Sequence, residues 1–190
     1  MRELTYYAAV TIDGFIAGPD GQFDGFVFEG SHPAAVGEKY VGAVNTAMAD
    51  AIGLPIDGGP FDSVLMGWNT YAVGLPDHPS PYSHLRQIVF TREHTAPEGA
   101  DGVEFTDRDP VEVVRALKAE SGKGIWLCGG GALAATLRDE IDRLALKRNP
   151  VLFGGGIPLF AEGGYAPERW RAPVITPYES GLVLAEYERG

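Results

Sequence analysis

Four apolar residues run directly into three glycines in the stretch Ile125-Trp126-Leu127-Cys128-Gly129-Gly130-Gly131-Ala132-Leu133-Ala134. An apolar segment that favours helix continues to Leu137. This order predicts a buried strand, a tight glycine turn and a helix that begins at the carboxyl end of the strand. Glycine lets the backbone approach a ligand closely because no Cβ intervenes, and the free N–H groups of a helix N-terminus suit phosphate. The stretch therefore indicates a cradle for the pyrophosphate of a dinucleotide.

Further strand and helix signals alternate along the chain on both sides of this stretch. Strands are expected over residues 4–11, 63–67, 86–91, 103–105 and 141–153, with a terminal hairpin of 172–178 and 182–187. Helices are expected from Pro33 to about Ile52 (with Ser31 as a possible cap), from Trp68 (capped by Asn69 or Thr70), over 110–121 behind the cap Asp109, and over 132–138. This alternation predicts one α/β domain over residues 1–190, with a mainly parallel sheet and an antiparallel edge.

Composition excludes several classes of protein. The 190 residues carry 26 acidic and 15 basic side chains, for a net charge of −11. Binding to nucleic acid or to an anionic membrane needs clustered cations, so neither is expected. No apolar run reaches the roughly 20 residues of a membrane span, and a single cysteine favours a reducing compartment, so we expect a cytoplasmic protein. The four histidines have no metal-ligand spacing, and no metal is expected.

The glycine stretch formally satisfies the Rossmann fingerprint, with Ala134 in the third glycine position. A Rossmann domain also requires an acidic residue about 20 positions further on, at the end of the next strand, to bind a ribose. That region is Lys147-Arg148-Asn149-Pro150, which is basic. The sequence therefore disfavours a Rossmann site, although a nucleotide site of another kind remains open.

An ordered set of short motifs resembles the dihydrofolate reductase-like superfamily, and the branch it most resembles is the reductase domain of riboflavin biosynthesis. The motifs are Thr11-Ile12-Asp13-Gly14-Phe15-Ile16-Ala17, Gly67-Trp68-Asn69-Thr70-Tyr71, Phe90-Thr91-Arg92, Cys128-Gly129-Gly130-Gly131, Asp139-Glu140-Ile141 and the segment 150–160. The resemblance covers nearly the whole chain. It implies a three-layer α/β/α fold and a nicotinamide cofactor, usually NADPH, and it implies that the first two glycines are often joined by a cis peptide.

The resemblance also assigns residues to the cofactor. Ala8, Ala9 and Ile16 would lie by the nicotinamide and its ribose. Gly67, Asn69 and Thr70 would meet the pyrophosphate and the adenosine side. Thr91 and Arg92 would meet the adenosine ribose and any 2′-phosphate. Gly129, Gly130, Gly131, Ala132 and Leu133 would wrap the pyrophosphate. Two positions that often hold a cation in this superfamily are Trp68 and Ala132 here, so NADH also stays open as the cofactor.

The substrate side is less defined by the sequence. Asp13 is the acid nearest to the expected hydride, where it could orient a water or a substrate nitrogen. An aspartate before glycine also stabilises a turn, and this second interpretation of Asp13 has at least equal weight. Cys128 is expected to be a buried strand residue, and Gly154-Gly155-Gly156 a bend rather than a second phosphate site.

The leading hypothesis is therefore an NAD(P)H-dependent reductase that transfers a hydride to a small heterocyclic substrate, such as a pteridine, a pyrimidine or a flavin precursor. The rival hypothesis is a non-catalytic protein that keeps this fold and binds a small ligand. The partner expected in either case is a small molecule, and the resemblance makes a homodimer plausible.

Overall fold

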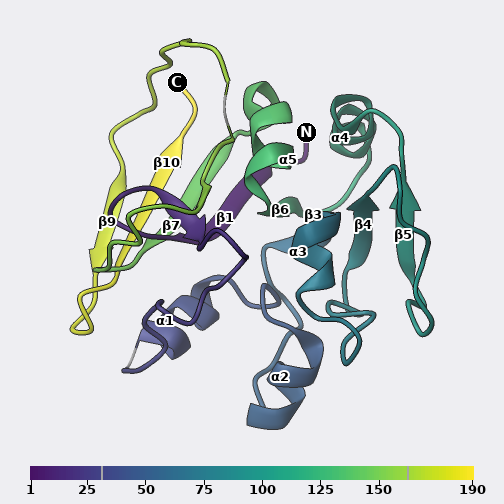
Figure 1. Ribbon diagram of the computed structural model, residues 1–190, viewed down its shortest axis with the longest axis horizontal. Coiled ribbons are helices and arrows are strands. Elements are labelled where there is room, and N and C mark those ends of the chain that lie inside the picture. The colour runs from purple at the N-terminus through teal and green to yellow at the C-terminus, as the bar shows by residue number, and fades with distance from the viewer. Residues whose placement is uncertain (31, 162) are drawn as a thin grey trace.

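The structure, a computed structural model, describes residues 1–30, 32–161 and 163–190. Across these ranges, eight strands form one sheet (Figure 1). They are β1 (Leu4–Val10), β3 (Phe61–Gly67), β4 (Arg86–Phe90), β5 (Val103–Thr106), β6 (Gly124–Gly129), β7 (Arg143–Arg148), β9 (Val174–Pro177) and β10 (Val183–Glu188). Their order is β5-β4-β3-β6-β1-β7-β10-β9, so the glycine-ended strand β6 lies beside β1 in the centre. A central strand with both faces covered explains the unbroken apolar run that precedes the glycines.

The six strands from β5 to β7 are parallel, and the last two strands in the order are antiparallel. β10 pairs with β7, and β9 pairs with β10 at the edge of the sheet. The predicted mainly parallel sheet with a C-terminal antiparallel hairpin is therefore confirmed.

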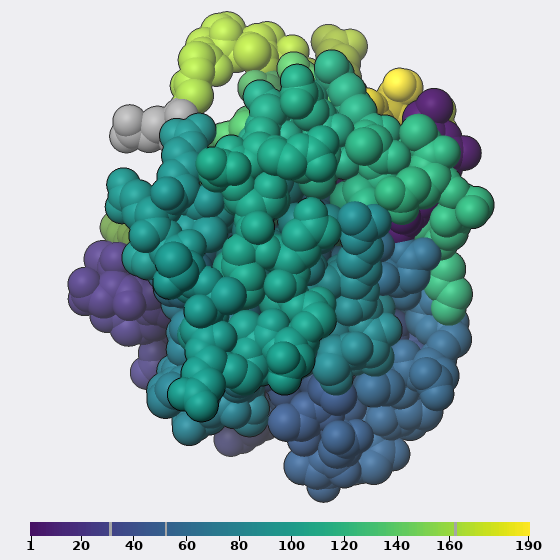
Figure 2. Space-filling view, turned by 90° about the vertical axis from the view of Figure 1, so that its right-hand side faces the viewer, coloured from purple at the N-terminus to yellow at the C-terminus, as the bar shows by residue number. Residues whose placement is uncertain are grey.

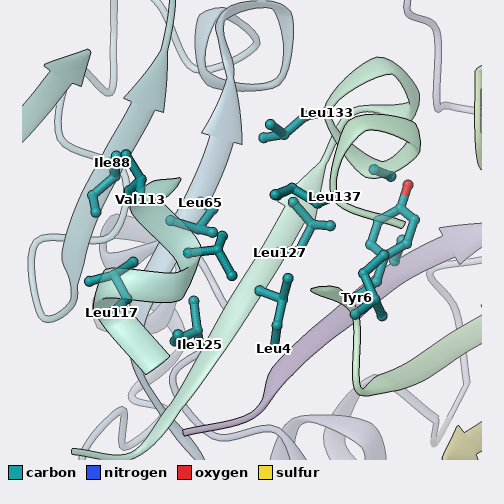
Figure 3. Close-up of a cluster of buried hydrophobic side chains, with 14 residues drawn as sticks. Leu4, Tyr6, Leu65, Ile88, Val113, Leu117, Ile125, Leu127, Leu133 and Leu137 are labelled. Carbon is teal, nitrogen blue, oxygen red and sulfur yellow. The ribbon is translucent and has the colours of Figure 1, made fainter. Parts of the chain in front are cut away.

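Helices cover both faces of the sheet and give three layers. Helices α4 (Pro110–Ala119) and α5 (Gly131–Thr136) pack on one face, where their leucines meet those of β1 and β6 (Figure 3). Helices α1 (His32–Lys39) and α3 (Trp68–Ala72) contribute Val36 and Tyr71 to the core on the other face. Residues of β6 alternate between the two cores, with Leu127 in the first and Trp126 in the second. The side of the molecule that carries β4, β5 and α4 is formed mostly by the middle of the chain (Figure 2).

Helix α4 begins as the sequence predicts. The side chain of Asp109 accepts hydrogen bonds from the amides of Val111 and Glu112, and Pro110 occupies the first turn. The helix buries Val114 and Leu117 and ends at Ala119, two residues before the predicted end.

The single helix predicted over residues 33–52 is wrong. The structure has α1 and a separate α2 (Thr46–Ile52), with Gly42 at a φ of 83° between them. The side chain of Asn45 accepts hydrogen bonds from the amides of Ala47 and Met48, which starts a new helix. Met48 is exposed, so the apolar spacing across 36–52 does not mark one buried face. The possible cap Ser31 lies outside the described residues.

Three other boundaries also differ from the predictions. α3 begins at Trp68 behind Gly67, without a side-chain cap from Asn69 or Thr70. α5 ends at Thr136 and is followed by a 3₁₀ turn, η1 (Arg138–Glu140). β7 ends at Arg148 because Asn149-Pro150 leads the chain away, so residues 151–153 form no strand.

Candidate functional site

The two central strands separate at their carboxyl ends. Within the described residues, β1 and β6 pair only as far as Tyr6 and Leu127. Beyond these residues, β1 continues to Val10 against β7, while β6 continues to Gly129 against β3. Ala8 and Ala9 therefore lie on one side of the separation and the glycine stretch on the other. In open parallel sheets, ligands bind outside the carboxyl ends of the strands, and this separation gives a ligand access to the backbone there.

The glycine corner after β6 meets the glycine corner after β3. Gly129 has a φ of 145° and is joined to Gly130 by a cis peptide bond, which confirms that expectation. A Cβ on Gly130 would lie 3.3 Å from Oγ1 of Thr70, and a Cβ on Gly67 would lie 3.7 Å from the amide nitrogen of Gly130. Residues 67–70 and 129–133 are therefore adjacent, at the place where the sequence assigns the pyrophosphate. Small residues on both sides keep the two backbones accessible.

Gly131 fixes the position of α5 relative to a small second sheet. β2 (Phe15–Ala17) pairs with β8 (Ile157–Pro158) in an antiparallel ladder. A Cβ on Gly131 would lie 2.2 Å from the carbonyl oxygen of Pro158, and the Gly131 carbonyl accepts a hydrogen bond of 3.0 Å from the amide of Ala161. The third glycine therefore holds two segments together, whereas Gly154-Gly155-Gly156 forms the bend that leads into β8.

The side chains assigned to the nicotinamide end are divided between the two faces of the sheet. Ala8 belongs to the core cluster on the α5 face, and Ile16 packs against this cluster. Leu133, which the sequence assigns to the pyrophosphate, belongs to the same cluster. Ala9 is the register partner of Lys147 on β7 and points to the α1 face, because side chains alternate along a strand. Ala132, which the sequence assigns to the pyrophosphate, is exposed on α5.

The residues assigned to the adenosine end come from the turns after β3 and β4. The rings of Trp68 and His94 stack with centroids 4.0 Å apart and planes 7° apart. The hydroxyl of Thr91 accepts a hydrogen bond from the amide of His94, which fixes this turn. Arg92 is exposed and forms no ion pair with any described residue. Arg92 lies in the same turn as His94, the residue on whose ring Trp68 stacks. Asn69, the remaining residue assigned here, is exposed on α3.

Asp13 joins two loops. Its carboxylate accepts hydrogen bonds from the hydroxyl of Thr11 (2.5 Å) and from the amides of Phe153 (3.2 Å) and Gly154 (2.8 Å). These bonds, the one from Thr11 first, lower the pKa of the Asp13 carboxyl below its ordinary value, so it is ionised at neutral pH. The geometry supports the turn-stabilising interpretation of this residue.

A group of polar side chains that the sequence did not predict as a site lies on the α1 face, at the same end of the sheet. The ammonium of Lys147 lies over the ring of Tyr7, 4.4 Å from its centroid. The Tyr82 hydroxyl is 3.9 Å from the Cys128 sulfur. Burial raises the pKa of Cys128 to about 11, and burial lowers the pKa of Lys147. These residues come from distant parts of the sequence, so no motif spacing could have indicated them.

A cavity of about 320 Å³ opens at the opposite edge of the sheet, beside Glu3, Phe61 and Gly124 at the starts of β1, β3 and β6. It lies at the amino ends of the strands and is therefore separate from the glycine corners. Among the described residues, no group of three His, Cys, Asp or Glu side chains is arranged to hold a metal ion. None of the helices described has the length and apolar character needed to cross a membrane.

The chain matches known proteins over most of its length. Residues 2–184 match the model of the RibD C-terminal domain family. Two relatives from Bacillus subtilis (strain 168) are both uncharacterized proteins. YwjB is 30% identical over 165 residues, covering 85% of this chain and 84% of YwjB. YyaP is 26% identical over 168 residues, covering 85% of this chain and 81% of YyaP.

Solved structures with similar folds include three proteins with related names. A putative riboflavin biosynthesis protein from Shewanella sp. PV-4 has a TM-score of 0.72 at 24% identity, covering 100% of this chain and 99% of that chain. A deaminase/5-amino-6-(5-phosphoribosylamino)uracil reductase from Thermotoga maritima has a TM-score of 0.65 at 18% identity, covering 100% of this chain and 57% of that one. A pyrimidine reductase-like protein from Corynebacterium diphtheriae has a TM-score of 0.62 at 17% identity, covering 98% of this chain and 91% of that one. At these identities the likeness concerns the fold.

Proposed function

This chain belongs to the RibD C-terminal domain family, and on that basis we propose that it is an NAD(P)H-dependent reductase of a small heterocyclic substrate. The observation that supports this proposal is the separation of β1 and β6 beyond Tyr6 and Leu127, next to the paired glycine corners. A bound nicotinamide cofactor would supply the hydride. The names of two similar proteins, a putative riboflavin biosynthesis protein and a 5-amino-6-(5-phosphoribosylamino)uracil reductase, support a substrate that resembles a pyrimidine or flavin precursor.

The residues at this edge fit such a cofactor by their size and charge. Gly67 and Gly130 would leave room for the pyrophosphate, and Thr70 would offer a hydroxyl to it. The backbone of Ala8 and Ala9 would meet the nicotinamide where β1 leaves β6. Arg92 would give NADPH its advantage over NADH, because a guanidinium pairs well with phosphate. The protein's own contribution would be to align the cofactor with the substrate and to exclude water.

Cofactor binding is the direct test of the proposal. Purified protein is titrated with NADPH and with NADH, and cofactor fluorescence is followed to obtain the two dissociation constants. We expect a sub-millimolar constant for at least one cofactor, and tighter binding of NADPH. Arg92→Met should reduce the preference for NADPH without weakening the binding of NADH, because NADH has no 2′-phosphate. Failure of both cofactors to bind at millimolar concentration contradicts the proposal.

The rival function, a non-catalytic protein that binds a small ligand, is favoured by two positions. Two positions that often hold a cofactor-binding cation in the dihydrofolate reductase-like superfamily are Trp68 and Ala132 in this chain. This hypothesis predicts that pterins, flavin precursors or quinones bind without oxidising NADPH or NADH. Absorbance at 340 nm, recorded beside ligand binding by calorimetry, separates the two functions.

A further inference from the structure

A partly buried lysine without an acidic partner lies on the α1 face of the proposed site. Lys147 is the register partner of Ala9 on β1, and its ammonium lies 4.4 Å from the centre of the Tyr7 ring. No carboxylate in residues 1–30, 32–161 and 163–190 forms an ion pair with it. Every other lysine or arginine in these ranges is either exposed or paired with an acid. Lys147 therefore has a charge that no acid among the described residues neutralises.

The nearest buried acid on this face is already engaged. Glu186 on β10 accepts a hydrogen bond of 2.6 Å from the hydroxyl of Tyr40 and is paired with Lys39. The titratable groups beside Lys147 are Tyr7 from β1 and Cys128 from β6, and Tyr82 lies against Cys128. Burial raises the pKa of all three, so they are neutral at pH 7. An ammonium among neutral groups attracts an electron-rich oxygen from a ligand.

We propose that Lys147 is a catalytic residue of this reductase, which holds the carbonyl oxygen of a conjugated substrate and donates a proton to it. The inference rests on the proposed function and narrows its substrate to a class, compounds with a reducible carbonyl. The ring of Tyr7 is buried and stacked on Tyr40, so the ammonium of Lys147, and not this ring, would meet the substrate. A pterin protonated on a ring nitrogen needs a carboxylate instead, and Glu186 is committed to Tyr40 and Lys39.

The proton step needs only the ammonium of Lys147, water and the hydride donor of the proposed function. The carbonyl carbon would receive its hydride from the bound nicotinamide cofactor, and the electrons of the C=O π bond would move to the oxygen. That oxygen forms an O–H bond with a proton from the Lys147 ammonium, whose N–H bond breaks. The neutral amine then takes a proton from water. Burial lowers the pKa of Lys147, which makes the ammonium a better proton donor than an exposed lysine.

Three variants separate this role from a structural one. Lys147→Met removes the charge and keeps most of the length, Lys147→Arg keeps the charge but holds its proton throughout the accessible pH range, and Lys123→Met makes the matched change at the exposed opposite edge of the sheet. Dissociation constants for NADPH are measured first. The rate is then followed at 340 nm with quinones, α-diketones, pyrimidines and pterins, between pH 6 and pH 10.

We expect the wild type to reduce carbonyl compounds, with a rate that falls at high pH as Lys147 loses its proton. Lys147→Met should lower kcat about a hundredfold or more while the dissociation constant for NADPH changes less than about twofold. Lys147→Arg should restore KM but not kcat, and should abolish the fall at high pH. Lys123→Met should behave as the wild type.

The protonation of Lys147 can also be followed by NMR, without any catalytic turnover. The lysine side chains are labelled with ¹³C at Cε, and the Lys147 signal is identified by its absence in Lys147→Met. We expect it to titrate below the exposed lysines and to shift when a carbonyl substrate is added with oxidised cofactor.

Four results overturn the inference. They are a kcat for Lys147→Met within about threefold of the wild type, a pH profile for Lys147→Arg equal to that of the wild type, a Lys147 signal that no carbonyl substrate shifts, and a wild type that binds NADPH but reduces only pterins or nothing. The fourth of these results would still agree with the proposed binding of a nicotinamide cofactor. A protein that binds neither NADPH nor NADH instead defeats the proposed function and the inference with it.

Discussion

Replacing Gly131 with alanine tests whether the glycine stretch is locked against the segment that contains β8. The added Cβ would lie 2.2 Å from the carbonyl oxygen of Pro158 and 3.4 Å from the amide nitrogen of Ala161. Both are backbone atoms, so no flexible side chain can move away to relieve the contact. Either α5 or the segment 158–161 must shift by about 1 Å to restore an ordinary van der Waals separation.

The expected loss of stability follows from three terms. Overpacking of this kind costs about 1–3 kcal/mol. The shift also weakens the hydrogen bond from Ala161 to the Gly131 carbonyl, which contributes roughly 0.5–1.5 kcal/mol. Alanine stabilises the first turn of a helix relative to glycine by about 0.5–1 kcal/mol. Taken at their mid-points, the three terms give a net cost of about 2 kcal/mol. This lowers the melting temperature of a domain of this size by about 4–8 °C.

Differential scanning calorimetry on Gly131→Ala, beside Gly155→Ala, measures this effect. Gly155 lies in the other run of three glycines, and a Cβ there would meet nothing within 4 Å. The control should therefore melt within about 2 °C of the wild type. Gly131→Ala should also bind NADPH more weakly where α5, and not the segment 158–161, is the element that shifts. A Gly131→Ala variant that melts within about 2 °C of the wild type refutes the close contact.

Three further predictions concern single side chains. Asp13→Asn should lower the melting temperature most at neutral pH and least below about pH 4, because a carboxyl whose pKa is lowered by folding stabilises the folded state above its ordinary pKa and loses that effect as pH falls. Ellman's reagent should label Cys128 slowly at pH 8 and at once in denaturant, since a thiol with a pKa of about 11 is only about one-thousandth thiolate at pH 8. Trp68→Arg should raise the preference for NADPH over NADH roughly tenfold or more, measured by fluorescence titration, although it loses the stack on His94.

The sequence predicts those parts of the fold that depend on local chemistry. The apolar run before Gly129 and the turn residues around Gly181 indicate a strand and a hairpin through their own composition, and both are present. Asp109 and Pro110 define the start of α4, because a cap acts on the amides two and three positions away. A local cap also explains why the single helix predicted over 33–52 is wrong. Asn45 is a cap inside the apolar pattern, and its local hydrogen bonds prevail over the helical spacing on either side.

The sequence predicts the part of the candidate site that glycine backbone forms. Glycines at the ends of β3 and β6 mark positions where strands stop and chains approach, and the two corners do meet beside Thr70. The interpretation of Asp13 could not be decided in the sequence, because its partners Phe153 and Gly154 lie about 140 residues away along the chain. The Asp13 carboxylate stabilises the fold by accepting hydrogen bonds from these two amides, and this role is visible only when the two loops are seen together in the structure.

The surroundings of the Lys147 charge differ between the sequence and the folded structure. In the sequence it belongs to a basic segment with Arg148, and the segment argues only against a Rossmann site. In the fold these neighbours diverge, because side chains alternate along β7: Arg148 is exposed, whereas Lys147 lies over Tyr7 on the α1 face. With a net charge of −11, the protein has many acids that could neutralise a lysine. Lys147 nevertheless forms no ion pair with any acid among the described residues, and it lies beside β1 where that strand separates from β6. This unpaired lysine is the strongest physical reason to expect an oxygen-bearing substrate at this edge of the sheet.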